Sequence, residues 1–112
     1  MTVLLLQTAA ARAEFISNEQ LLDWLNEATR RGGSFKDTTL ALGFVSAVHD
    51  LDAGREICAP GGLRARELLK KVHEWMRGNS QSAWGANGAA TARQALIETY
   101  PCPRNPADDA RR

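Results

Sequence analysis

The sequence predicts an all-α fold, a small single-domain bundle of about four helices. Its 112 residues suffice for one domain with a modest core, and 44% of them are hydrophobic, as in ordinary globular proteins. Apolar residues recur at helical spacing in four segments, which turn and capping residues separate. No segment shows the alternation of apolar and polar residues that is typical of a half-buried strand.

The first two helices are expected in the N-terminal half of the chain. Ser17-Asn18-Glu19-Gln20 has the form of a capping box, and Arg30-Arg31-Gly32-Gly33 ends the helix that it begins. The second helix is expected from about 35 to 52. Its predicted buried stripe consists of Leu40, Ala41, Phe44, Ala47, Val48 and Leu51. Leu42 and Val45 add apolar surface outside this stripe, which predicts that the helix is central or lies at an interface; for an interface, the candidate partner is a second copy of the chain.

The third and fourth helices are expected at about 65–77 and 89–100. On the third, an apolar face is expected at Leu68, Leu69, Val72, Trp75 and Met76, opposite a solvent-facing side with Arg66, Lys70, Glu74 and Arg77. The turn-rich loop between these helices holds one large aromatic residue, Trp84. That residue either covers the core as a plug or stands exposed as a contact anchor for a partner.

The two ends of the chain differ in composition from the expected helical domain at 14–102. Residues 1–13 combine a short apolar stretch with Ala11-Arg12-Ala13, which matches the cleavage pattern of a secretory signal peptide. Because a basic start is missing, the segment is interpreted as a signal peptide truncated at its front. The alternative is a helical turn of the mature domain. The polar tail at 103–112 is expected to be disordered.

Two cysteines, Cys58 and Cys102, each stand where a helical segment meets a proline-bounded loop. If they pair, the disulfide closes a loop of about 44 residues, worth about 4 kcal/mol in the chain-entropy model. Such a bond indicates an oxidising compartment, for example the bacterial periplasm. The alternative is a catalytic cysteine activated by His49 or His73. The disulfide explains both cysteines and the signal-like start together.

Other functional classes find little support in the sequence. The net charge of +1 gives no electrostatic footprint for nucleic acid or an anionic membrane, and no membrane insertion is expected. His49, Asp50 and Asp52 do not converge from one helix, so no metal site is predicted. No phosphate-binding glycine motif is present, and no cofactor is expected. The sequence therefore favours a binding protein that is not an enzyme.

Several stretches resemble the Rap/Tai family of type VI secretion immunity proteins. They are FISNEQLLDWL at 15–25, LGFVSAVHD at 42–50, CAPGGL at 58–63, Glu67-Leu68, and the closing Tyr100-Pro101-Cys102. Each motif is short, but their order and spacing follow the family pattern over about residues 15–102. The chain departs from that pattern at Leu25 and Ala41, where many members carry a second cysteine pair, and at Arg64, where a capping threonine is common.

The resemblance implies a small periplasmic protein, often a homodimer, that binds a secreted peptidoglycan amidase effector and blocks its active site. The candidate contact surface is the outer face of the third helix and the loop after it: Arg66, Lys70, Glu74, Arg77, Asn79, Gln81 and Trp84. A rival hypothesis from another class is a periplasmic stress or chaperone-like helical protein that has no dedicated toxin partner.

Overall fold

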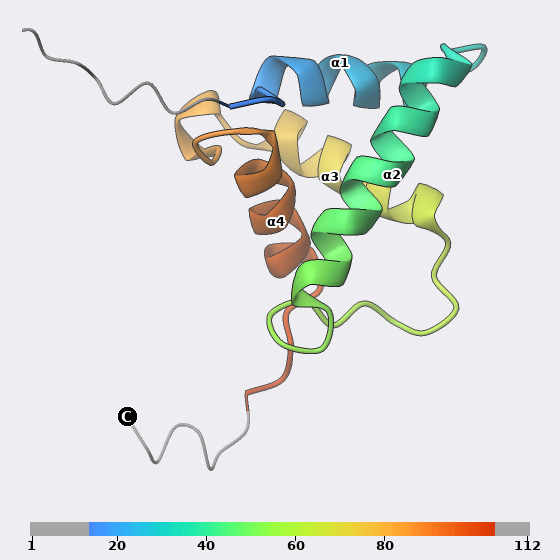
Figure 1. The fold of residues 1–112 in the computed structure, drawn as a ribbon. Coiled ribbons are helices and arrows are strands. Elements are labelled where there is room, and N and C mark those ends of the chain that lie inside the picture. Colours follow the sequence, from blue (N-terminus) through green and yellow to red (C-terminus); the bar gives the residue numbers. More distant parts are fainter. Residues whose placement is uncertain (1–13, 105–112) are drawn as a thin grey trace, which may run out of the picture.

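The computed structural model describes residues 14–104, which form four α-helices and one short 3-10 helix without a strand (Figure 1). The helices are α1 (Asn18–Ala28), α2 (Phe35–Asp52), α3 (Ala65–Gly78) and α4 (Gly88–Thr99), and the 3-10 helix η1 (Gln81–Ala83) precedes α4. The predicted all-α fold is confirmed. The signal peptide expected at 1–13 and the expected tail from residue 105 onward lie outside the described residues.

Side-chain caps fix the first turn of three of the four α-helices. Ser17 accepts a hydrogen bond from the backbone N–H of Gln20 at 3.1 Å, and Ser34 accepts one from that of Asp37 at 3.1 Å. Asn87 caps α4 in the same way. Arg64 occupies the N-cap position of α3 and makes no capping hydrogen bond with its side chain, as expected of a long cationic residue. The starts of α1, α2 and α4 are therefore explained by hydrogen bonds to the side chain of the residue directly before each helix.

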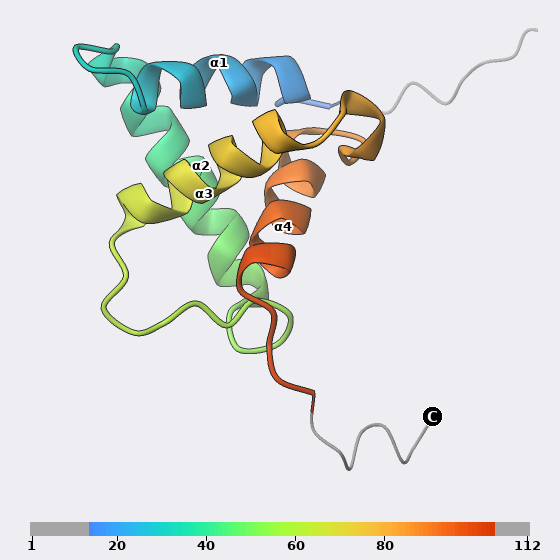
Figure 2. The same ribbon diagram turned by 180° about the vertical axis from the view of Figure 1, so that it is seen from behind.

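The core lies where all four α-helices meet (Figures 1 and 2). Helix α1 lies across one end of the bundle, and α2 and α3 lie on opposite sides of it, with α2 toward the viewer in Figure 1 and α3 in Figure 2. Trp24 of α1 packs edge-on against Phe44 of α2, with ring centroids 5.9 Å apart. The largest fully buried side chains are Leu21, Leu25, Val45, Ile57, Val72, Met76, Thr91 and Leu96.

The buried face of α2 differs from the predicted one. It consists of Ala41, Val45, Val48 and Asp52, whereas Leu40 and Leu51 are 40% and 75% exposed. Ala47 is exposed as well. The observed buried face is shifted by about one residue from the predicted one, and it ends at Asp52, whose carboxylate two arginines bind. The prediction was therefore wrong for Leu40, Ala47 and Leu51.

Asp52 joins the end of α2 to α4. Its carboxylate accepts hydrogen bonds from Arg93 Nε at 2.6 Å and from Arg55 Nη2 at 3.1 Å, and only 8% of the side chain is exposed. Its carbonyl oxygen also accepts the N–H groups of Arg55, Glu56 and Ile57 in the turn that follows. The hydrogen bond from Arg93, and then that from Arg55, holds the pKa of Asp52 below its ordinary value.

We expect the Asp52→Asn variant to unfold at a lower temperature than the wild type at neutral pH. Because the folded protein lowers the pKa of Asp52, the stabilisation is complete above the pKa of an unfolded aspartate, about 3.9. It is lost as the pH falls through the lower pKa of the folded state. The difference in Tm between wild type and variant should therefore narrow toward pH 3. Asp23→Asn, at an exposed residue of α1, is the control.

The predicted disulfide is present. Cys58 and Cys102 are bonded with their Cα atoms 4.8 Å apart, and they join the chain after α2 to the chain after α4. Beside the bond, the backbone N–H of Cys58 donates to the carbonyl of Tyr100 at 2.8 Å. Ile57, immediately before Cys58, is fully buried. The loop between α2 and α3 is therefore attached to the core at its first residues.

Candidate partner-binding face

The outer side of α3 carries four charged residues that are all exposed. Arg66, Lys70, Glu74 and Arg77 follow one another at intervals of three or four residues, so they lie along one side of the helix. The opposite side buries Leu68, Leu69, Val72 and Met76 in the core. We call this row of four charged residues the α3 face. It lies on the side of the bundle that Figure 2 presents.

Few charges of the α3 face are neutralised within the chain. Glu74 makes an ion pair with Lys71 of the same helix, at 3.5 Å. Within residues 14–104, Arg66, Lys70 and Arg77 have no carboxylate within ion-pair distance. The face therefore presents three cations whose charges are free to interact with a partner.

A polar contact between α1 and α3 holds the α3 face in place. His73 Nε2 lies 2.8 Å from Asn26 Oδ1, and its Nδ1 lies 3.3 Å from Thr29 Oγ1. Burial lowers the pKa of His73, and the positive charge of Arg77 lowers it further. A neutral ring with its proton on Nε2 donates to Asn26. His73 is therefore a link between helices, not a base beside a cysteine, because both cysteines are bonded to each other.

The loop after α3 is less exposed than its composition suggests. Trp84 is half-buried against the core, and its indole N–H donates to the carbonyl of Met76 at 3.2 Å. Asn79 donates from its side chain to the carbonyl of Trp75 at 2.8 Å. Both side chains thus satisfy carbonyl groups at the end of α3. Gln81 is exposed. Trp84 thus covers part of the core, and its contact with a partner stays a prediction.

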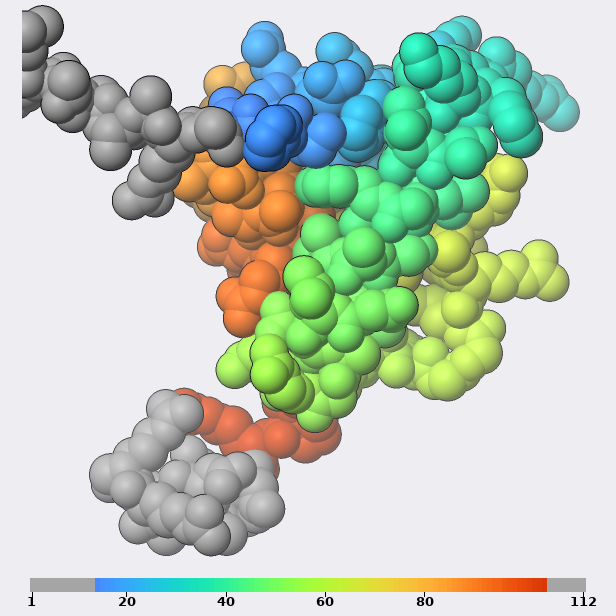
Figure 3. All heavy atoms as spheres, viewed as in Figure 1, coloured from blue at the N-terminus to red at the C-terminus, as the bar shows by residue number. Residues whose placement is uncertain are grey.

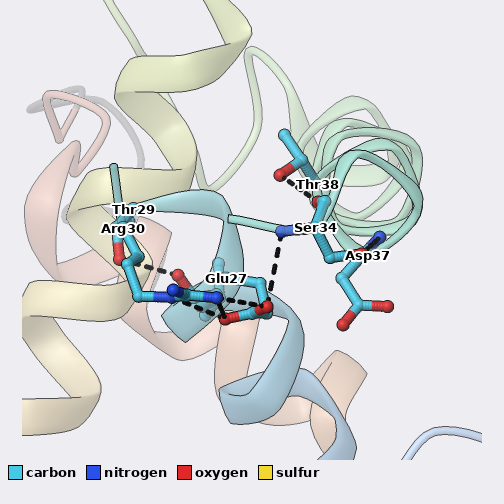
Figure 4. Close-up of polar contacts among 7 residues, drawn as sticks. Glu27, Thr29, Arg30, Ser34, Asp37 and Thr38 are labelled. Atoms are coloured by element: carbon cyan, nitrogen blue, oxygen red, sulfur yellow. Dashed lines mark hydrogen bonds and ion pairs between the residues drawn. The ribbon is translucent and has the colours of Figure 1, made fainter. Parts of the chain in front are cut away.

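The turn between α1 and α2 is held by Glu27 (Figure 4). Its carboxylate accepts two hydrogen bonds from the Arg30 guanidinium, at 2.9 and 2.8 Å, and one from the backbone N–H of Ser34 at 3.3 Å. The hydrogen bond from Arg30 is the main cause that lowers the pKa of Glu27. At the end of this turn stands Phe35, whose side chain is 86% exposed.

Three hollows are lined in part by residues of α3. One of about 170 Å³ lies between the end of α1 and the start of α3, and a second of about 210 Å³ continues it toward the α1–α2 turn. A third, of about 260 Å³, lies between His49 of α2 and the loop after the disulfide. In Figure 3 that loop, in yellow-green, stands away from α2 and leaves an opening.

The expected dimer residues occupy unequal positions. Val45 is fully buried in the core of its own chain, so the expectation that it contacts a second copy is wrong. Leu42 is half-buried and packs against the same core. The exposed side of α2 instead carries Leu40, Gly43, Ala47 and Leu51.

Two further findings on residues 14–104 concern membrane-spanning helices and metal-binding clusters. None of their helices is long and apolar enough to cross a membrane. Nor do these residues place three or more histidine, cysteine, aspartate or glutamate side chains where they could hold a metal ion together. The residues described thus form a small disulfide-linked helical domain with a charged outer face and adjoining hollows.

A comparison with protein families identifies the chain. The model of the Rap1a immunity proteins matches residues 17–102, which span all four α-helices and both cysteines. The chain therefore belongs to the Rap1a immunity protein family. No curated protein and no solved structure matches the chain in the corresponding comparisons.

Sequence reasoning missed Phe35 and the hollows beside Arg66. The sequence places Phe35 only at the start of the second helix, directly after the capping Ser34. The hollows could not be predicted, because they depend on how closely α1 and α3 approach each other. The exposure of Arg66, Lys70, Glu74 and Arg77 did follow from helical spacing.

Proposed function

We propose that this protein is a type VI secretion immunity protein that acts in the periplasm. It binds a secreted peptidoglycan amidase effector and blocks its active site, so that peptide crosslinks in the cell wall are not cut. The observation that carries the proposal is the family match over residues 17–102. The disulfide supports the compartment, because such bonds persist in oxidising environments.

The proposed contact surface is the α3 face with the loop that follows it. Three cations there have no carboxylate partner within the described residues, and Gln81 is exposed beside them. Trp84 and Asn79 contribute by fixing the loop against the end of α3, and the remaining exposed edge of Trp84 can touch the partner. A stable interface buries about 800 Å² on each partner, which one helix and one loop can supply.

Co-expression in the periplasm tests this function. An amidase-type effector encoded beside this protein's gene is directed to the periplasm, and growth is measured with and without the immunity protein. Growth should be restored by the wild type, and the same effector should be harmless when its active-site nucleophile is replaced. Lysis that continues despite abundant, folded immunity protein would reject this effector as the target.

The homodimer that the resemblance implies has a structural candidate in the exposed side of α2. Leu40, Gly43, Ala47 and Leu51 form an apolar stripe with small residues at its centre. No atom lies near the position that a Cβ of Gly43 would occupy, so a second helix can approach closely there. We therefore propose an antiparallel α2–α2 contact around Gly43.

The charges at the two ends of this stripe fit the same arrangement. A two-fold axis through Gly43 places Lys36 opposite Asp50 of the second copy, since both lie seven residues from Gly43. Lys36 has no ion pair within residues 14–104. This arrangement therefore pairs opposite charges at both ends of the contact, where Asp50 also lies 2.8 Å from Nδ1 of His49.

Charge-swap variants test this dimer in sedimentation experiments. Lys36→Asp and Asp50→Lys should each shift the wild-type dimer toward monomer, because each places like charges opposite one another. The double variant restores opposite charges and should dimerise again. A wild type that is monomeric at all concentrations, or single variants that still dimerise, would contradict the arrangement. Effector binding by monomeric variants would show that the two surfaces work independently.

A further inference from the structure

The first turns of α3 and the α1–α2 turn border a continuous groove. Its two hollows, of about 170 and 210 Å³, share Ala28 and Arg66. Lys70 lines one of them, and Phe35 lines the other. Leu69, which is 2% exposed, contributes apolar surface at its base. We call this feature the Arg66 groove, after the charged residue common to both hollows.

The charges of the Arg66 groove are unbalanced. Glu27 lines the groove, but its carboxylate is already bound by Arg30 and by the N–H of Ser34. Arg66 and Lys70 are exposed, one helical turn apart, and have no ion pair with any carboxylate of residues 14–104. Two cations thus stand over an apolar base, and the acid that lines the groove is already bound.

Phe35 adds an apolar contact point at the far end of the groove. Its side chain is 86% exposed, at the start of a helix that is held by the Ser34 cap and by the bond from Ser34 to Glu27. An exposed aromatic side chain on such a fixed backbone loses little freedom when a partner covers it. Trp84, the aromatic that the sequence pointed to, is instead packed against the core.

We infer that the Arg66 groove binds an acidic segment of the effector protein. A carboxylate of that segment lies between the Arg66 guanidinium and the Lys70 ammonium, and a neighbouring apolar side chain contacts Leu69 and Phe35. The pairing of cations with apolar surface fits a polypeptide, since a small anion would use only the charges. The inference rests on the proposed function, which supplies an effector to bind.

Charge reversal combined with a salt series tests the inference, using the purified disulfide-bonded protein and the effector that it neutralises. Arg66→Glu and Lys70→Glu should each raise Kd by about tenfold or more, since each places a like charge against the acidic segment. Phe35→Ala should raise Kd by about 30-fold if this residue is a hot spot. Arg64→Glu makes the same change of charge at an exposed residue just before α3 that lines neither hollow of the groove and is not part of the α3 face, and its effect should stay below about threefold.

The salt series separates recognition in the groove from general attraction. Binding by the wild type should weaken as salt rises. Binding by the double variant Arg66→Glu, Lys70→Glu should not weaken and should instead strengthen, because salt screens the repulsion between like charges. Reversing the acidic residue of the effector to lysine should restore binding to the double variant. Circular dichroism and an unchanged Tm establish that the variants are folded, as the exposure of both side chains predicts.

The possible results distinguish the two proposals. If the wild type binds the effector tightly and the groove variants bind equally well, the groove inference is overturned and the proposed function stands. If Arg64→Glu weakens binding as much as Arg66→Glu, general charge rather than the groove governs recognition, and the inference is likewise overturned. If the wild type binds no amidase effector at all, the proposed function itself fails.

Discussion

Reduction of the Cys58–Cys102 disulfide is expected to lower the free energy of unfolding by about 4 kcal/mol. The bond joins residues 44 apart in sequence, so cleaving it releases a large loop in the unfolded chain. For a domain of this size, the loss corresponds to a fall in Tm of more than about 15 °C. Thermal unfolding followed by circular dichroism, with and without a reductant, measures it.

The double variant Cys58→Ser, Cys102→Ser is the matched control for the reductant. It should unfold at nearly the same temperature with and without reductant, close to the value of the reduced wild type. The contact of Cys58 with Tyr100 uses backbone atoms, so the variant can retain it. A reduced wild type as stable as the oxidised one would show that the bond contributes little to stability.

The Leu96→Ala variant should lose about 2–5 kcal/mol of stability, the range measured when a buried leucine is truncated. Leu96 is fully buried on α4, where that helix packs against the others, so the variant creates a cavity in the core. Urea unfolding measures the loss through the midpoint of the transition. We expect an unchanged slope, because the surface exposed on unfolding is nearly the same.

Ile97→Ala provides the comparison for this prediction. Ile97 follows Leu96 directly on the same helix but is only half-buried, and it packs at the edge of the core. Its truncation should cost less than about 2 kcal/mol, since surrounding solvent and side chains fill the space more easily. Equal losses in the two variants would contradict the position of α4 in the core.

Local chemistry made the helices predictable from the sequence. Ser17 caps α1 as predicted, and the predicted bounds of α2 agree with the observed Phe35–Asp52. The two sides of α3 were predicted correctly because its charged and apolar residues lie on different sides of the helix. The pairing of the cysteines could also be predicted, since the chain has only two.

The buried face of α2 shows where sequence reasoning fails. The helix is apolar on more than one side, so hydrophobicity alone could not select the face. The observed face includes Asp52, whose charge is bound by Arg93 of α4, 41 residues away in sequence. Only a three-dimensional contact reveals that partner. A pattern of apolar residues could therefore not include this position in the buried face.

The candidate site was also only partly predictable, because some of its features depend on contacts between segments that are far apart in sequence. Helical spacing placed Arg66 and Lys70 on one exposed side, and the structure bears out that placement. The hollows beside them form between helices that are far apart in sequence, so no local pattern indicates them. Trp84 was ambiguous because its partner, the carbonyl of Met76, becomes available only where α3 ends.

The positions of α2 and α3 on opposite sides of the bundle have a consequence for stoichiometry (Figures 1 and 2). If copies of the chain pair through α2 and bind the effector through α3, neither contact obstructs the other. A dimer then carries two effector sites that face away from each other, and the complete complex contains two molecules of each protein. Titration should therefore saturate at one effector per chain at any concentration of dimer.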